Sequence, residues 1–178
     1  IAKLAETIDA FVAIDKGLRS LQLSAPEIYA EDLSAGLLLI EDLGSETCLL
    51  DGRPIPERYE LAAQLLARIH GEILPTILPV VDGRDHVIPE YDREALAIET
   101  ELVLDWYAPY RARVTLPSIA KSQFSRCWSG LFDKVLDGQR SWVLRDYHSP
   151  NLIWLADRDG LAKVGLIDFQ DAVLGHPA

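Results

Sequence analysis

Apolar residues recur at helical spacing near the start of the chain. Residues 3–22 place them on one face of an amphipathic helix: Leu4, Ile8, Phe11, Leu18 and Leu21. Pro26 disfavours a helix at the residue before it, so we expect the helix to end before "SAPEIY". Residues 28–30 and 36–41 then predict two strands around the turn "EDLSAG". Because "LLLI" is apolar without alternation, we expect the second strand to be buried on both faces.

A connector and three helices are predicted next. Glycine and proline are frequent in "DLGSETCLLDGRPIPE", which predicts a connector over residues 44–56. A helix beginning at Pro56-Glu57 follows, with Gly71 as its expected C-terminal cap. Residues 72–90 predict a proline-bearing loop, and Asp92 is expected to cap a helix through Trp106. A further helix is expected to begin at Ser118, with these residues inward: Phe124, Cys127, Leu131 and Val135.

The last forty residues predict short strands that carry polar loops. The expected strands are residues 141–145, 151–155 and 161–167. We expect the first two to form a hairpin across a polar turn and "ADRDG" to join the last two. The whole pattern predicts an α+β fold with a small mixed lobe, residues 1–43, and a larger, mainly helical lobe, residues 57–178.

Composition narrows the class of protein. Hydrophobic residues make up 49% of the 178 residues, and no apolar stretch is long enough to span a membrane. The net charge of −11 argues against a basic nucleic-acid surface. Cys48 and Cys127 fit no metal or redox spacing, so we expect buried free thiols and a cytoplasmic location. The chain begins at Ile1, contains no Met and stops just after a polar loop, so we expect it to be part of a longer protein.

Two aspartates follow strand-like runs in this C-terminal part, and an asparagine lies close to the first of them. Asp146 comes after "WVLR", Asp168 comes after "VGLI", and Asn151 follows Asp146 by five residues. Carboxylate and amide oxygens suit Mg²⁺, which keeps several waters and needs few protein ligands. The remaining carboxylate is then free to orient or deprotonate a hydroxyl. We therefore predict a magnesium and phosphate site with a general base beside it.

This spacing carries a family resemblance. D-x-x-x-x-N followed by D-F-x is typical of the kinase fold. "RDYHSPNLIWL" with "GLIDFQDA" resembles the aminoglycoside phosphotransferase family of kinase-like small-molecule kinases, whose patterns are H-G-D-x-H-x-x-N and I-D-[FW]-G-[DR]-A. "LLLIEDLG" resembles the hinge strand of that family, and "LARIHG" resembles its first large-lobe helix. The resemblance implies a protein-kinase-like two-lobed fold whose small lobe is incomplete here.

The resemblance also implies roles for individual residues. Asp146 matches the catalytic aspartate, and Asn151 and Asp168 match the ligands of the Mg²⁺ that bridges the ATP phosphates. On the nucleotide side, Glu41 and Leu43 match hinge positions whose backbone carbonyl and amide meet adenine. An apolar floor under adenine is implied for Ile153 and Ile167. Contacts to phosphate or substrate are implied for Arg145, His148 and Asp171.

The sequence also departs from the family pattern. Leu144 stands in place of the motif histidine, and Gln170 in place of the glycine after Phe169. No glycine-rich phosphate loop or strand lysine is visible, since Lys3 and Lys16 fall in the predicted helix.

The acceptor is left open by these motifs. Within the family, "LRDYHSPN" and "DFQDAVLGHP" are most similar to bacterial kinases that phosphorylate the anomeric hydroxyl of N-acetylmuramate and N-acetylglucosamine. The alternatives are an aminoglycoside-resistance kinase and, from another class, a catalytically inactive nucleotide-binding or scaffold module.

Several other polar and aromatic residues have simpler readings. His70 near a helix end is expected to be a charged partner of the helix dipole. Four acidic residues in the predicted helix after Asp92 are expected to form a solvated face; the alternative is that they contact substrate. They are Glu94, Glu99, Glu101 and Asp105. The tryptophans are expected in the core rather than on a stacking surface: Trp106, Trp128, Trp142 and Trp154.

Overall fold

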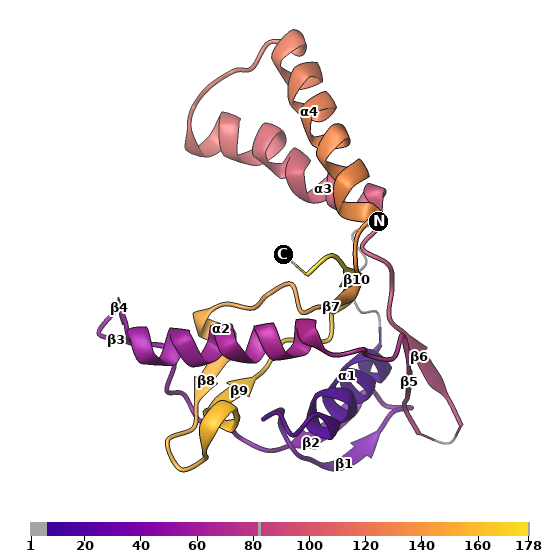
Figure 1. Ribbon diagram of the computed structural model, residues 1–178, viewed down its shortest axis with the longest axis vertical. Coiled ribbons are helices and arrows are strands. Elements are labelled where there is room, and N and C mark those ends of the chain that lie inside the picture. The colour runs from indigo at the N-terminus through magenta and orange to yellow at the C-terminus, as the bar shows by residue number, and fades with distance from the viewer. Residues whose placement is uncertain (1–6, 82, 178) are drawn as a thin grey trace.

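The computed structural model describes residues 7–81 and 83–177 as a mixed α+β arrangement with a helical arm (Figure 1). The first part contains α1 (Ile8–Ser20), β1 (Ile28–Asp32), β2 (Leu37–Ile40), β3 (Leu49–Leu50) and β4 (Arg53–Pro54). The middle contains α2 (Pro56–Gly71), β5 (Ile77–Pro79), β6 (Asp85–Val87), α3 (Arg93–Leu102), a π-helix (Val103–Arg111) and α4 (Ser118–Leu136). The last part contains β7 (Ser141–Val143), β8 (Leu152–Trp154), β9 (Val164–Leu166) and β10 (Val173–Gly175), with 3₁₀ turns at Ser149–Asn151 and Gly160–Lys163. The expected α+β class is confirmed.

The core lies between α1, α2 and the C-terminal strands. Fully buried side chains there include Leu18, Leu65 and Leu166, together with the indole of Trp142. The Trp142 indole nitrogen donates to the Pro75 carbonyl at 2.9 Å. A Cβ atom on Gly17 would lie 2.5 Å from this ring, so α1 packs directly on β7 only because Gly17 has no side chain.

The pairing of the short strands differs from the expected hairpin over residues 141–155. Strand β7 pairs with β10, and β8 pairs with β9, both antiparallel. The polar segment between β7 and β8 therefore carries the chain from one two-stranded sheet to another. The expected turn at "ADRDG" does join β8 to β9, through the 3₁₀ turn at Gly160–Lys163. Residues 72–90, expected to be a loop, contain the antiparallel hairpin of β5 and β6.

The β1–β2 hairpin forms where predicted, but the expected burial of its second strand is wrong. Leu37 is 63% exposed and Leu39 is 61% exposed. The two strands pair only with each other among the described residues. An apolar strand is buried only where a second layer covers it, and the described residues provide none over this face.

The helical arm of α3 and α4 stands away from the other elements in Figure 1. Asp92 caps α3 as predicted, with its side chain accepting from the Ala95 amide at 2.9 Å. The predicted helix to Trp106 instead ends as an α-helix at Leu102 and continues as the π-helix, where Trp106 is 63% exposed. The expectation that Trp106 is a core residue is therefore wrong, whereas Trp142 is buried and Trp128 and Trp154 are half-buried.

The inward face of α4 is rotated from the one predicted. Phe124, Trp128 and Phe132 form a row at i, i+4 spacing with rings about 6 Å apart, at centroid distances of 6.1 and 5.9 Å. Leu131 and Val135 are partly exposed, and the expected burial of Cys127 is wrong because its side chain faces solvent. Aromatic rings occupy the seam against α3 in place of the aliphatic set. Pro117, not Ser118, occupies the N-cap position.

Two expectations at the end of α2 also change. Gly71 is the last helical residue, and Glu72 follows it with φ −93°, so no left-handed glycine cap forms. Burial lowers the pKa of His70, which disfavours the cation that the expected dipole role requires. The predicted first helix begins at Ile8 in the structure, while residues 3–6, including Lys3, lie outside the described residues.

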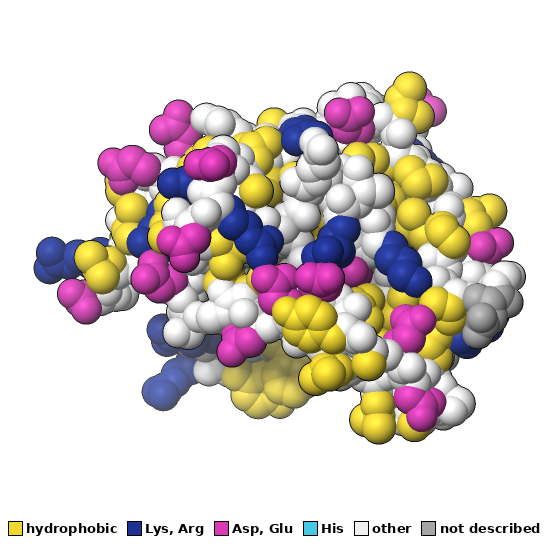
Figure 2. Space-filling view, turned by 90° about the horizontal axis from the view of Figure 1, so that it is seen from below, with side chains coloured by type: hydrophobic (Ala, Val, Ile, Leu, Met, Phe, Trp, Pro, Cys, Tyr) yellow, Lys and Arg dark blue, Asp and Glu magenta, His cyan; other side chains and the backbone are white. Residues whose placement is uncertain are grey.

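The surface shows mixed charge. On the face drawn in Figure 2, acidic and basic side chains are interspersed with hydrophobic ones, and the Lys and Arg side chains form no continuous patch. Across residues 7–81 and 83–177, the search for a membrane-spanning helix finds none that is long and apolar enough. The predicted lobe boundaries at 43 and 57 remain predictions.

Candidate active site

The loop between β7 and β8 is a chain of tight turns. The Asp146 amide donates to the Leu144 carbonyl at 2.8 Å, the His148 amide to Asp146 at 3.0 Å, and the Asn151 amide to His148 at 2.9 Å. Pro150 lies in the closing 3₁₀ turn. These bonds hold Asp146 and Asn151 on the same side of a short polar segment. The side chain of Asp146 is 54% exposed, so its carboxylate is accessible.

Tyr147 anchors this loop to α2. Its hydroxyl donates to the Ala62 carbonyl at 2.6 Å, and burial followed by the neighbouring Cys48 raises the pKa of Tyr147. The tyrosine therefore stays a protonated donor at neutral pH. Sequence reasoning assigned no role to Tyr147, although a long aromatic side chain between Asp146 and His148 is a visible signal for an anchor.

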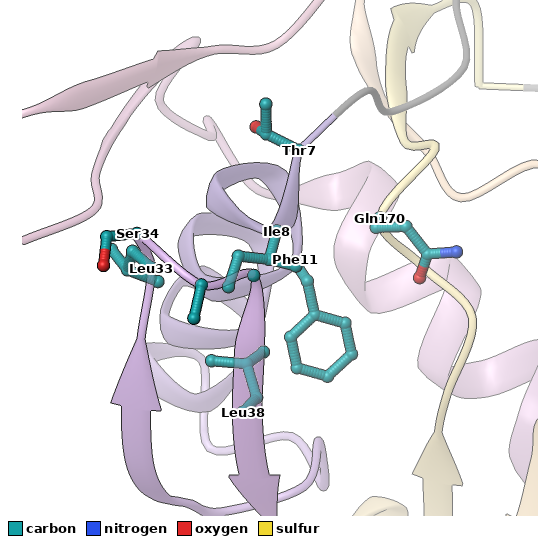
Figure 3. Close-up of a pocket in the computed structure, with 9 residues that line it drawn as sticks. Thr7, Ile8, Phe11, Leu33, Ser34, Leu38 and Gln170 are labelled. Atoms are coloured by element: carbon teal, nitrogen blue, oxygen red, sulfur yellow. The ribbon is translucent and has the colours of Figure 1, made fainter.

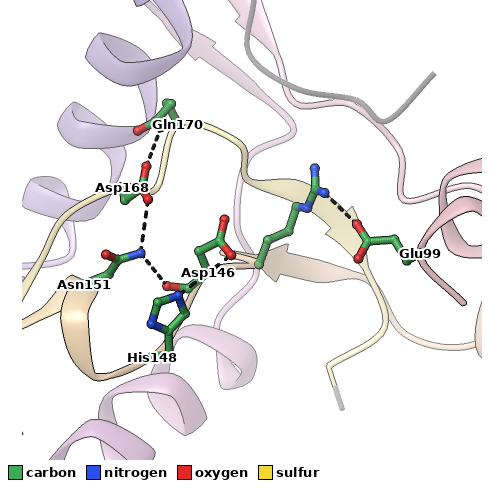
Figure 4. Close-up of polar contacts among 7 residues, drawn as sticks. Glu99, Asp146, His148, Asn151, Asp168 and Gln170 are labelled. Atoms are coloured by element: carbon green, nitrogen blue, oxygen red, sulfur yellow. Dashed lines mark hydrogen bonds and ion pairs between the residues drawn. The ribbon is translucent and has the colours of Figure 1, made fainter. Parts of the chain in front are cut away.

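A second loop brings Asp168 to the same place. The Ile167 amide donates to the Asn151 carbonyl at 3.2 Å, which joins the loop before β8 to the loop after β9. The Asn151 side-chain nitrogen donates to Asp168 Oδ2 at 3.2 Å and to the Asp146 carbonyl at 3.1 Å (Figure 4). The structure thus brings Asp146, Asn151 and Asp168 together, while their roles remain predictions.

Asp168 itself adopts a left-handed conformation, with φ 59°. Aspartate tolerates this region better than most residues. The conformation turns the chain sharply after β9, with the carboxylate beside Asn151 and the next side chain in the core. That next side chain is Phe169, which is 1% exposed and stacks on Phe11 of α1 at a centroid distance of 4.9 Å.

Gln170 supplies a contact that the sequence did not predict. Its amide nitrogen donates to Asp168 Oδ1 at 2.7 Å, so both carboxylate oxygens of Asp168 accept from side-chain amides. The signal was the replacement of the family glycine by Gln170. A side chain at this position reaches back to the carboxylate, which a glycine cannot do.

The donor set suits a divalent cation of the hard type. Asp168 offers carboxylate oxygens and Asn151 an amide oxygen, the ligand types that Mg²⁺ prefers. No group of three or more His, Cys, Asp or Glu within residues 7–81 and 83–177 could hold a metal. Two protein ligands leave most of an Mg²⁺ octahedron to phosphate and water, which fits a metal bound together with a nucleotide.

An open hollow of about 660 Å³ adjoins these residues. Figure 3 shows Thr7, Ile8 and Phe11 of the α1 region on one side of it, and Leu33, Ser34 and Leu38 of the β1–β2 hairpin on another. Gln170 also lines the hollow, so the loop that carries Asp168 reaches its edge. The space is large enough for part of a nucleotide.

The predicted hinge lies along the β8–β9 hairpin. The Glu41 amide donates to the Glu27 carbonyl at 2.7 Å, and the Glu41 carboxylate accepts from Arg158 at 2.6 Å. Leu43 lies over Gly165, where a Cβ atom would be 3.1 Å from the leucine methyl. Gly165 pairs with Ile153, so Leu43 and the buried Ile153 belong to one apolar region. Ile167, at the end of β9, is half-buried.

The candidate substrate contacts lie around Asp146. His148 Nε2 lies 4.0 Å from Asp146 Oδ1, and both side chains are more than half exposed. Asp171 is half-buried, three residues beyond Asp168. The guanidinium of Arg145 donates to Glu99 Oε1 of α3 at 2.6 Å (Figure 4).

This contact changes the reading of the acidic residues on α3. Glu99 is 40% exposed and pairs with an arginine that is only 15% exposed, so it is not part of a solvated face. Asp105 pairs with Lys121 on the arm surface at 3.6 Å.

Arg145 has φ 60°, a left-handed conformation that costs an L-residue about 1–2 kcal/mol. The family pattern has glycine at this position, which adopts such a conformation freely.

Comparison with known proteins agrees with this geometry. The sequence model of a group described as "Phosphotransferase enzyme family" matches residues 1–178. The chain is 36% identical to N-acetylmuramate/N-acetylglucosamine kinase of Caulobacter vibrioides, over 100% of this chain and 50% of that protein. It is 33% identical to the protein of the same name from Pseudomonas putida, over 96% of this chain and 46% of that protein. The chain therefore spans about half the length of the curated relatives it matches.

A solved structure supports the fold. The crystal structure of choline kinase LicA from Streptococcus pneumoniae matches 98% of this chain and 56% of its own, with a TM-score of 0.56 and 18% sequence identity. Identity at this level concerns the fold alone. The prediction of a protein-kinase-like α+β fold is confirmed.

Proposed function

The chain belongs to the phosphotransferase enzyme family, and from that premise we propose that it catalyses ATP- and Mg²⁺-dependent phosphorylation of an amino sugar. The acceptor we propose is N-acetylmuramate or N-acetylglucosamine, at the anomeric hydroxyl. The convergence of Asp146, Asn151 and Asp168 carries the proposal. The names of the relatives from Caulobacter vibrioides and Pseudomonas putida support the choice of sugar.

Asp146 is the proposed general base. Its exposed carboxylate can accept or orient the proton of an acceptor hydroxyl, which typically contributes about 10²–10⁴ in rate. The turns that follow Leu144 fix its backbone, and Tyr147 ties the loop to α2. Little covalent chemistry is required of the protein, because phosphoryl transfer depends mainly on alignment and charge stabilisation.

Asn151 and Asp168 are the proposed metal ligands. A bound Mg²⁺ would neutralise charge on the ATP phosphates. Asp168 is held for this task by its left-handed backbone and by Phe169, which is buried against α1. The amides of Asn151 and Gln170 keep its carboxylate in place beside the hollow.

The nucleotide and the acceptor approach from different sides in this proposal. Adenine lies against the hinge, where the Glu41 carbonyl and the Leu43 amide bind its edge and Ile153 and Ile167 form the floor. The acceptor lies beside Asp146, within reach of His148 and Asp171. Because the donor is ATP and both cysteines are free thiols, we propose a cytoplasmic reaction.

The test is phosphate incorporation from ATP into a panel of sugars. We expect free N-acetylmuramate or N-acetylglucosamine to be phosphorylated, and the corresponding methyl glycosides, whose anomeric oxygen is blocked, to be inert. Asp146→Asn should lower kcat by about 10²–10⁴ and leave ATP affinity within a few-fold. Asp133→Asn, at an exposed position on the arm, is the matched control and should retain activity.

Two results would contradict the proposal and favour one of the alternatives. Phosphorylation of kanamycin-type aminoglycosides with none of the amino sugars would favour the aminoglycoside-resistance alternative. ATP binding without transfer to any acceptor, unchanged by Asp146→Asn, would favour an inactive nucleotide-binding module.

A further inference from the structure

The residue before the proposed base has an unusual backbone and an unusual partner. Arg145 adopts φ 60° where the family pattern has glycine, so its side chain must be accommodated at a position that favours none. Its guanidinium donates to Glu99 Oε1 of α3, and this contact is the dashed line drawn at Glu99 in Figure 4. The two residues are 46 apart in sequence and their atoms 2.6 Å apart.

Tyr91 is a second neighbour of Glu99. Burial followed by the charge of Glu99 raises the pKa of Tyr91, so this tyrosine stays protonated. The Tyr91 amide donates to the Leu174 carbonyl of β10 at 2.8 Å. Strand β10 pairs with β7, and β7 leads directly into the loop of Asp146. Glu99 therefore belongs to a closed chain of contacts that begins and ends at the loop of Asp146.

This chain of contacts also connects the helical arm to the candidate site. Apart from their seam with each other and the contacts of α3 with the π-helix that continues it, α3 and α4 make few contacts with other elements among the described residues. The Arg145–Glu99 contact is thus a direct link between the arm and the loop of Asp146. Since the arginine is 15% exposed, water shields this ion pair less than it shields the surface pairs of the arm.

We propose that Arg145 and Glu99 are positioning residues whose ion pair fixes the left-handed turn before Asp146 and couples the helical arm to the catalytic loop. The proposal rests on the proposed function in assigning Asp146 as the base. In this proposal the pair acts without touching ATP or acceptor, which replaces the contact to phosphate or substrate that the family resemblance implies for Arg145. It acts by holding the Asp146 carboxylate in line with the acceptor hydroxyl, and a misplacement of about 1 Å can cost about 10²-fold in rate.

The first experiment separates positioning from substrate binding by steady-state kinetics with ATP and N-acetylglucosamine. Glu99→Gln keeps the shape and removes the charge, and we expect kcat to fall about 10- to 100-fold with both KM values within about two-fold. Arg145→Lys should retain part of the activity. The exchanged pair, Arg145→Glu with Glu99→Arg, should recover more than either single change.

The matched control is Asp133→Asn, which breaks the surface ion pair between Arg93 and Asp133 on the same arm. It should leave kcat unchanged. Arg145→Gly guards against misfolding as an explanation, because glycine fits the turn, and this variant should still lose activity by the same factor as Glu99→Gln. A rise in KM at unchanged kcat would make these residues substrate contacts and overturn the proposal.

A second experiment needs no acceptor. Hydrogen exchange by mass spectrometry on the protein without ligands should show the segment 144–151 exchanging about ten-fold faster in Glu99→Gln than in wild type, since loss of the contact frees the loop. Asp133→Asn should show no change there. Equal exchange in all three proteins would disprove the coupling. Failure of the wild type to phosphorylate amino sugars, with this difference in exchange intact, would instead count against the proposed function alone.

Discussion

The buried carboxyl of Asp15 should make the stability of this protein depend on pH. Asp15 lies in α1 with 1% of its surface exposed, and its Oδ1 has no hydrogen-bond partner among the described residues. Burial, opposed by Arg19 and Lys16, raises the pKa of Asp15 to about 7. Asp15→Asn removes the ionisable group and keeps its shape, so a comparison with wild type isolates this one carboxyl.

The direction in which the free energy of unfolding changes with pH follows from the two pKa values of Asp15. They are about 7 in the folded chain and 3.8 in the unfolded chain. Below the lower value the carboxyl is protonated in both states and adds no dependence on pH. Between them the unfolded chain releases the proton and the folded chain keeps it, so the free energy of unfolding falls by about 1.4 kcal/mol for each pH unit. The loss levels off above about pH 7, at a total of about 4 kcal/mol.

Urea unfolding followed by circular dichroism from pH 5 to pH 8.5 measures this effect. The stability of Asp15→Asn relative to wild type should rise by roughly 2.5 kcal/mol between pH 5 and pH 8, most of it below pH 7, and stay level above. Asp133→Asn, whose carboxylate is 70% exposed, should show no such trend. A constant difference between Asp15→Asn and wild type across the whole range would refute the reasoning.

Three further outcomes are expected. Gly17→Ala should lower the free energy of unfolding by about 1–3 kcal/mol, measured in urea, because its methyl group would collide with Trp142; an unchanged midpoint would contradict that packing. Asp92→Ala should cost about 0.5–2 kcal/mol and reduce helical circular dichroism on heating, since the Ala95 amide loses its acceptor; identical melting curves would argue against the cap. Asp168→Asn keeps a residue type that tolerates a left-handed backbone, yet calorimetry should find that its ATP affinity no longer responds to Mg²⁺ or EDTA, whereas a full response would remove Asp168 from the metal site.

Features with a local cause could be predicted from the sequence. The Asp92 cap depends on a hydrogen bond three residues away, and the helix at Pro56–Gly71 on its own apolar spacing and first-turn proline. The approach of Asn151 to Asp168 depends on one antiparallel strand pair, because Asn151 lies just before β8 and Asp168 lies just after its partner β9. The short motifs therefore contained much of the candidate site.

Features that depend on distant partners could not be predicted. The pairing of β7 with β10 joins segments that no turn connects, so strand propensity alone could not distinguish it from a hairpin with β8. The Arg145–Glu99 contact depends on where α3 lies relative to the loop of Asp146. Whether Cys127 faces α3 or solvent depends on which row of apolar residues on α4 packs against α3. The packing of the Phe132 ring selects another row, and Cys127 is left exposed.

The exposed β1–β2 hairpin has a practical consequence for handling the protein. Each of its strands has one edge that pairs with no other strand among the described residues, and Leu37 and Leu39 face outward beside these edges. Unpaired apolar edges accept strands from neighbouring molecules. A preparation of these 178 residues should therefore associate with itself as concentration rises, through intermolecular β-sheets that raise thioflavin fluorescence and light scattering together.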